Sequence, residues 1–122
     1  MLLAVAESQG IQSEILPMIA TGFCSGVART GGQCGALSGA IMGLGLLTGR
    51  KEPGESVDEN YAQVKKLVEQ FEEKFGSINC QELTECHLGT ESGQTSFREK
   101  NQVANCLTYA ETATQMVLDL VN

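Results

Sequence analysis

The stretch Gly22–Gly49, GFCSGVARTGGQCGALSGAIMGLGLLTG, joins a glycine-rich loop to an uncharged small-residue segment and carries two of the five cysteines. Glycines before Cys34 allow positive φ or a close approach of two backbones, and the segment from Cys34 to about Thr48 has a helical pattern. Cys34 is therefore predicted at a helix N-terminus. Free N–H groups and the helix dipole favour a thiolate there, which is the form that attacks disulfides and binds metals.

Glycine recurs at every fourth position of this helix, as Gly35, Gly39 and Gly43. An interior glycine costs about 0.5–1 kcal/mol relative to alanine, so the row predicts an offsetting close contact with another helix, a ligand or a subunit. The stretch between Arg29 and Arg50 has no charge, but its high glycine content favours a buried central helix over a membrane span.

Composition and charge limit the class of protein. A chain of 122 residues with 42% hydrophobic residues and no tryptophan favours one helical domain. The net charge of −7, without a basic stripe, argues against nucleic-acid binding. We expect an all-α, bundle-like domain over residues 1–122 with about five helices, a glycine-rich loop preceding the buried small-residue helix.

Two helices are expected before the glycine-rich loop. The first ends near Ser8, before Gly10, and the second runs from a Ser13 cap to Phe23 with Pro17 in its first turn.

The segment 57–75 has the clearest amphipathic pattern in the chain. Ser56 to Glu59 fits a capping box, and Gly76 suits the C-terminal end. The expected apolar face consists of Val57, Tyr61, Val64, Leu67, Val68, Phe71 and Phe75.

The C-terminal third is predicted to hold two more helices. Ser77 or Asn79 caps a short one with Cys80 in its first turn, and residues 84–95 form a polar loop. A second capping box at residues 96–99 begins the last helix. Its expected buried stripe consists of Val103, Cys106, Leu107, Ala110, Val117 and Leu120.

The cysteines indicate metal or redox chemistry in a reducing cytoplasm, because their number is odd and no basic signal region precedes them. The sequence contains no C-x-x-C, so any site must be assembled by the fold. Cys34 and Cys80 share a helix-start setting and are the candidate reactive thiols. His87, beside Cys86, could complete a Cys₃His site, although a lone loop histidine is more often exposed.

Two segments carry a family resemblance. IATGFCSGVARTGGQCGALSGAIMGLG at residues 19–45 and FEEKFGSINCQEL at 71–83, followed by a cysteine in the last helix, resemble a family named for its C_GCxxG_C_C cysteine pattern. The resemblance implies a small α-helical domain of redox function, found alone or fused to multihaem cytochromes, for which iron–sulfur binding has been suggested.

Three cysteines match the family pattern by position: Cys34 in the C-G-A-x-x-G element, Cys80 in S-I-N-C, and Cys106 near the C-terminus. The chain begins where the family's first helix would end, so that helix and its cysteine are expected to be absent. Cys24 stands where the family commonly has glycine, and Cys86 is an additional thiol.

The leading hypothesis is a redox or electron-transfer protein whose cofactor ligands are Cys34, Cys80 and Cys106, with Cys24, and less strongly Cys86 or His87, as further ligands. The cofactor would be an iron–sulfur cluster, or Cys34 and Cys80 would act as redox-active thiols. The alternative is a helical interaction module, stabilised by zinc or free of metal, without redox activity. A redox protein or multihaem cytochrome would be the partner, and the glycine row and apolar N-terminus suggest a homodimer.

Overall fold

The computed structural model describes all 122 residues and is entirely helical, which confirms the all-α prediction. Seven right-handed helices exceed the expected five. They are α1 (Leu2–Ser8), α2 (Ile15–Ala20), α4 (Gly35–Thr48), α5 (Asp58–Phe75), α6 (Cys80–Thr84), α7 (Glu91–Glu99) and α8 (Gln102–Val121). A 3₁₀ turn, η1 (Thr21–Phe23), leads into α3 (Cys24–Arg29), which has a different hand.

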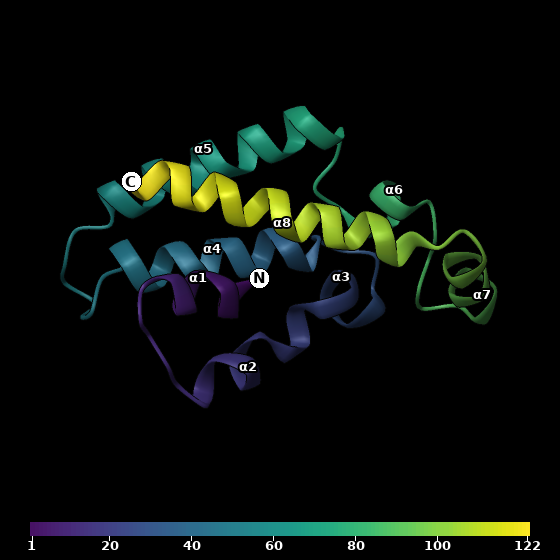
Figure 1. Cartoon of the computed structure of the whole chain (residues 1–122), viewed down its shortest axis with the longest axis horizontal. Coiled ribbons are helices and arrows are strands. Elements are labelled where there is room, and N and C mark those ends of the chain that lie inside the picture. Colours follow the sequence, from purple (N-terminus) through teal and green to yellow (C-terminus); the bar gives the residue numbers. More distant parts are fainter.

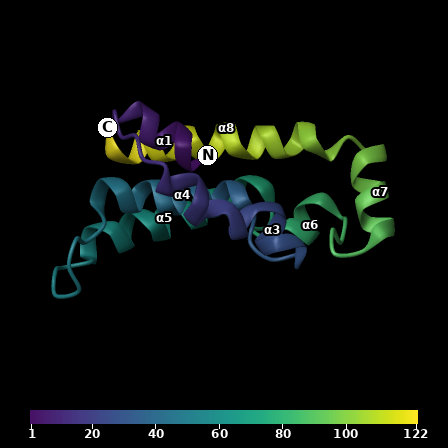
Figure 2. The same cartoon turned by 90° about the horizontal axis from the view of Figure 1, so that it is seen from below.

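The core lies where α4, α5 and α8 run side by side, with α1 against α4 (Figures 1 and 2). Each helix contributes one apolar face, and burial of these faces is the main stabilising term. The fully buried large side chains include Val5, Leu37, Leu44, Leu67, Phe71 and Val117.

Two glycines of the α4 row, Gly39 and Gly43, are covered by Met1 and α1, and the third, Gly35, by Phe23 and Cys24. A Cβ added at Gly39 would lie 2.8 Å from the Met1 Cγ, and one at Gly43 would lie 2.9 Å from the Val5 Cβ. The predicted close contact is thus made within the chain, which removes the row as an argument for a homodimer. As its composition predicts, α4 is central, and none of the helices combines the length and apolar character that a bilayer crossing requires.

The start of α5 differs in detail from the prediction. The helix begins at Asp58, and the Ser56 hydroxyl accepts a 3.3 Å hydrogen bond from the Asp58 N–H, so the expected capping box with Glu59 does not form. Tyr61 is exposed, although its position fits the apolar face. At the other end Gly76 has φ +85° and terminates the helix as predicted.

The expected start of the last helix at Ser96 is wrong. Ser96 lies inside α7, whose N-cap is Thr90: the Thr90 hydroxyl accepts a 3.0 Å hydrogen bond from the Gly93 N–H. The chain then turns at Asn101, with φ +50°, into α8. Serine, threonine and glycine are compatible with both turns and helix caps, so their presence at residues 84–95 does not distinguish a loop from the start of α7.

The N-terminal half of α8 extends beyond the core, toward α7 (Figure 2). Val103 is 53% exposed and Leu107 is 61% exposed, so their predicted burial is wrong. Cys106, on the inner side of the same turns, is half-buried, and Val117 in the C-terminal half is fully buried. Only half of the apolar stripe meets the bundle.

The segment labelled α3 is a left-handed turn. Ser25, Gly26, Val27 and Ala28 have φ between 52° and 67°, and Arg29 has φ 68°. A residue with a Cβ pays about 1–2 kcal/mol in this region, and a β-branched one such as Val27 is especially unusual there. Hydrogen bonds from the Thr30 hydroxyl (3.1 Å) and the Gly32 N–H (2.9 Å) to the Gly26 carbonyl hold the turn. Strain of this kind is commonly found at functional sites.

Candidate functional site

A short backbone pairing brings two remote cysteines together. Gln33 and Asn79 form an isolated antiparallel bridge, and the N–H groups of Cys34 and Cys80 each donate a 2.7 Å hydrogen bond to a carbonyl of the opposite segment. Because side chains alternate along paired segments, both cysteines project from the same face as diagonal neighbours. Such neighbours have Cα atoms about 7–8 Å apart.

Both cysteines stand at helix starts, as predicted. Cys34 is the N-cap of α4, and Cys80 is the first residue of α6 after its N-cap, Asn79. Each side chain is buried, with relative exposures of 9% for Cys34 and 8% for Cys80.

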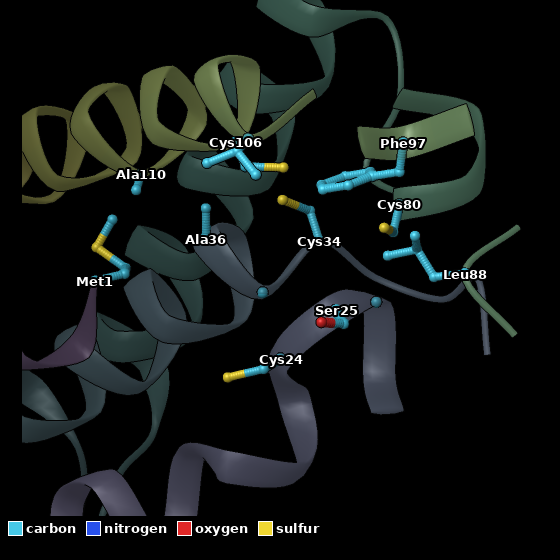
Figure 3. A pocket seen from close by; sticks show the side chains of 13 residues that line it. Met1, Cys24, Ser25, Cys34, Ala36, Cys80, Leu88, Phe97, Cys106 and Ala110 are labelled. Carbon is cyan, nitrogen blue, oxygen red and sulfur yellow. The ribbon is translucent and has the colours of Figure 1, made fainter. Parts of the chain in front are cut away.

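The third cysteine, Cys106, reaches the same cavity from α8. In Figure 3 its sulfur and that of Cys34 point toward one another, and the ring of Phe97 lies beside Cys106 and Cys80. The cavity has a volume of about 460 Å³ and is mainly apolar. Its lining is Met1, Cys24, Ser25, Gly26, Cys34, Gly35, Ala36, Cys80, Leu88, Phe97, Val103, Cys106 and Ala110.

The left-handed turn forms one wall of this cavity through Gly26. A Cβ at Gly26 would lie only 2.4 Å from the Cys80 Cβ and 3.1 Å from its Sγ. Since φ is also +67° here, only glycine fits both the backbone and the space. The strained turn and the position of Cys80 are therefore directly linked.

Burial dominates the protonation of the buried thiols. The Ala36 and Leu37 N–H groups face the Cys34 sulfur and lower its pKa without forming a full hydrogen bond, but desolvation outweighs them, so the pKa of Cys34 is raised. Desolvation, followed by repulsion from a negative charge on Cys34, raises the pKa of Cys80, and a charge on Cys86 acts in the same direction. The expectation of activated, low-pKa thiols at helix starts is wrong, because the helix ends lie in an apolar pocket.

Of the three thiols, Cys106 has the largest change in pKa. Burial, followed by the charges of Cys34 and Cys80, raises the pKa of its thiol to about 11. Burial and these same cysteines, Cys106 first, also raise the pKa of Tyr109, one turn along α8. The thiols therefore form one electrostatic group, which resists carrying several negative charges at once.

The other predicted ligands are less central. Cys24 lines the cavity, but its sulfur points away from the other three (Figure 3). Cys86 is buried outside the cavity lining, behind Cys80: the Thr84 hydroxyl bonds to the backbone of both, and the Cys86 sulfur lies 3.7 Å from the Ser96 hydroxyl. His87 is exposed, with its Nδ1 accepting from the Gly89 N–H. All five thiols are free, and no three Cys, His, Asp or Glu side chains are arranged around a single metal-ion position.

The cysteine arrangement agrees with a comparison of whole sequences. The family model described as "Putative redox-active protein (C_GCAxxG_C_C)" matches residues 1–120. The chain belongs to this family. Neither a curated protein nor a solved structure matches it. Within this C_GCAxxG_C_C member, the three cysteines that resemble the family pattern by position line one cavity.

Several residues of the site were not predicted from the sequence. Tyr109 lies three residues after Cys106, a helical spacing that could have indicated a shared face. Gly26 could have been suspected from the glycine-rich loop, but its contact with Cys80 depends on the bridge. Nothing in the sequence indicates Phe97 as a cavity residue, because α7 was not predicted.

Proposed function

We propose that this C_GCAxxG_C_C protein transfers electrons by means of an iron–sulfur cluster held by Cys34, Cys80 and Cys106. The observation that carries the proposal is the convergence of these three thiols on one apolar cavity of about 460 Å³. Sulfur is the preferred protein ligand of such clusters, and a cluster supplies one-electron redox chemistry when bound. The donor set and the size of the cavity fit such a group.

The chain's own residues would set the properties of the cofactor. The three thiols are protonated when no metal is present, because burial raises their pKa values, so ligation must release their protons. The N–H groups of Ala36 and Leu37 face the Cys34 sulfur, where they would stabilise negative charge and raise the reduction potential. Phe97 and Leu88 would limit access of water.

Direct thiol–disulfide exchange has less support. A disulfide requires Cα atoms about 4.4–6.8 Å apart, whereas diagonal neighbours across an antiparallel pair typically have Cα atoms about 7–8 Å apart, so the bridge geometry disfavours a bond between Cys34 and Cys80. Exchange also needs a thiolate, and the raised pKa values keep these thiols neutral near pH 7.

A single structural zinc ion also has less support than a cluster. Thiolates on one zinc lie about 2.3 Å from it, so their sulfurs must be within about 4 Å of one another. No such group of three side chains is present. The ligands of a cluster bind different iron atoms and therefore stand farther apart.

Anaerobic reconstitution with iron and sulfide tests the proposal. We expect visible charge-transfer absorption that dithionite bleaches and air or a mild oxidant restores, with iron and sulfide in comparable amounts. A well-folded, fully reduced protein that takes up neither iron nor sulfide would contradict it.

A further inference from the structure

The backbone of Cys24 lies at the cavity, whereas its side chain points out of it. A Cβ at Gly35, the residue after Cys34, would lie 3.4 Å from the Cys24 Cα and 3.1 Å from the Phe23 carbonyl oxygen. The Cys24 backbone therefore rests directly against the start of α4, beside the buried thiols. Its sulfur nevertheless points away from them, and the residue is exposed (Figure 3).

Little holds the Cys24 sulfur in this position. Its one hydrogen bond, to the Ala20 carbonyl, is long at 3.8 Å, and a thiol is a weak donor. A rotation about the Cα–Cβ bond changes where the sulfur points without moving the backbone. Cys24 also directly precedes the left-handed turn, in which Ser25 and Val27 have positive φ.

We propose that Cys24 is the fourth thiol of the cavity and turns inward to ligate when the cofactor is loaded. This inference rests on the proposed function, because it treats the cavity as a cofactor site. Cys34, Cys80 and Cys106 would form the permanent part of the site, and the exposed Cys24 would admit the cofactor before closing on it. The ligand class is the same, an iron–sulfur cluster, which commonly takes four thiolates.

Differential alkylation tests this on the unaltered chain. Anaerobic, reduced protein is treated with a maleimide before and after iron and sulfide reconstitution, and each cysteine is quantified by mass spectrometry. Cys24 should be the fastest thiol to react in the metal-free protein and should slow at least tenfold after loading. If the protein takes up iron and Cys24 keeps its metal-free rate, the inference is overturned while the proposed function stands. If no iron is taken up, both fail.

A matched pair of variants supplies a second readout. Cys24→Ser should release iron to a chelator at least tenfold faster than the unaltered protein, because one ligand is weakened. Cys86→Ser removes a thiol that does not line the cavity and should release iron at the original rate. Equal release rates for both variants, with folding verified by circular dichroism, would overturn the role of Cys24.

Discussion

The two halves of α8 differ in what surrounds them. The C-terminal half packs against α4 and α5 and places Val117 in a fully buried core. The N-terminal half leaves Val103 and Leu107 exposed and presents Cys106 to a cavity whose other wall is a strained left-handed turn. One end of the bundle therefore provides most of the stability through its buried core. The other end contains a cavity lined by cysteine thiols.

The largest expected effect is on stability. Leu44→Ala should lower the free energy of unfolding by about 3–5 kcal/mol, because Leu44 is fully buried in the core, ten residues along α4 from Cys34. Leu107→Ala, at the thiol end, should change it by no more than about 0.5 kcal/mol. Urea unfolding of both variants measures the difference, and comparable losses would contradict the proposed division between the two ends.

Gly26→Ala is expected to cause a smaller loss of stability together with a specific effect on the thiol cavity. Its new Cβ would collide with Cys80 at a backbone of positive φ, so we expect a loss of about 2–4 kcal/mol and impaired iron uptake. Gly76→Ala is the control, since Gly76 also has positive φ but nothing lies within 4 Å of its added Cβ. It should cost about 1–2 kcal/mol and leave iron uptake unchanged. Unchanged iron uptake in Gly26→Ala would refute the link between the turn and the site.

Replacing either of two exposed alanines by glycine should change the stability of the protein, in opposite directions. Ala28 lies in the left-handed turn with φ 52°, so Ala28→Gly should stabilise the protein by about 1 kcal/mol. Ala62 lies in the right-handed helix α5, where Ala62→Gly should destabilise it by about 1 kcal/mol. Thermal unfolding of the two variants gives the signs, and destabilisation by both would show that the turn is not strained.

A pH dependence of stability is also expected at the thiol end. Burial raises the pKa of Cys106 to about 11, above the value of about 8.5 for an unfolded thiol. The folded chain therefore keeps a proton that the unfolded chain loses, so the contribution of Cys106 to stability should be constant below about pH 8.5 and fall as the pH rises toward 11. The slope should be shallower in Cys106→Ser, and an unchanged slope would mean that Cys106 is not desolvated.

Local patterns were sufficient to predict much of the fold. Helix periodicity predicted α4 and α5, and the position of glycines relative to helical segments predicted Cys34 and Cys80 at helix starts. The helix start of α7 was missed because Thr90 and its neighbours favour caps and turns equally well. Val103 is exposed because the neighbouring helices do not extend to cover it. The periodicity of α8 predicts which face is apolar, but not how far the neighbouring helices reach.

The site was only partly predictable for a similar reason. The three thiols were predicted to converge, and they do line one cavity, but the bridge between Gln33 and Asn79 that joins two of them is a long-range contact. The sign of the pKa changes was missed because a helix N-terminus was assigned without its surroundings. In an apolar pocket, desolvation of a thiolate outweighs the helix N–H groups.

The most direct test of the central claim compares two buried thiols that lie six positions apart. Cys80→Ser and Cys86→Ser make the same chemical change at residues with relative exposures of 8% and 3%, but only Cys80 lines the cavity. Iron and sulfide content is measured after anaerobic reconstitution of each variant. Ligation of the cofactor by Cys80 predicts that Cys86→Ser keeps the content of the unaltered protein and that Cys80→Ser loses more than half. Equal contents in the two variants would contradict it.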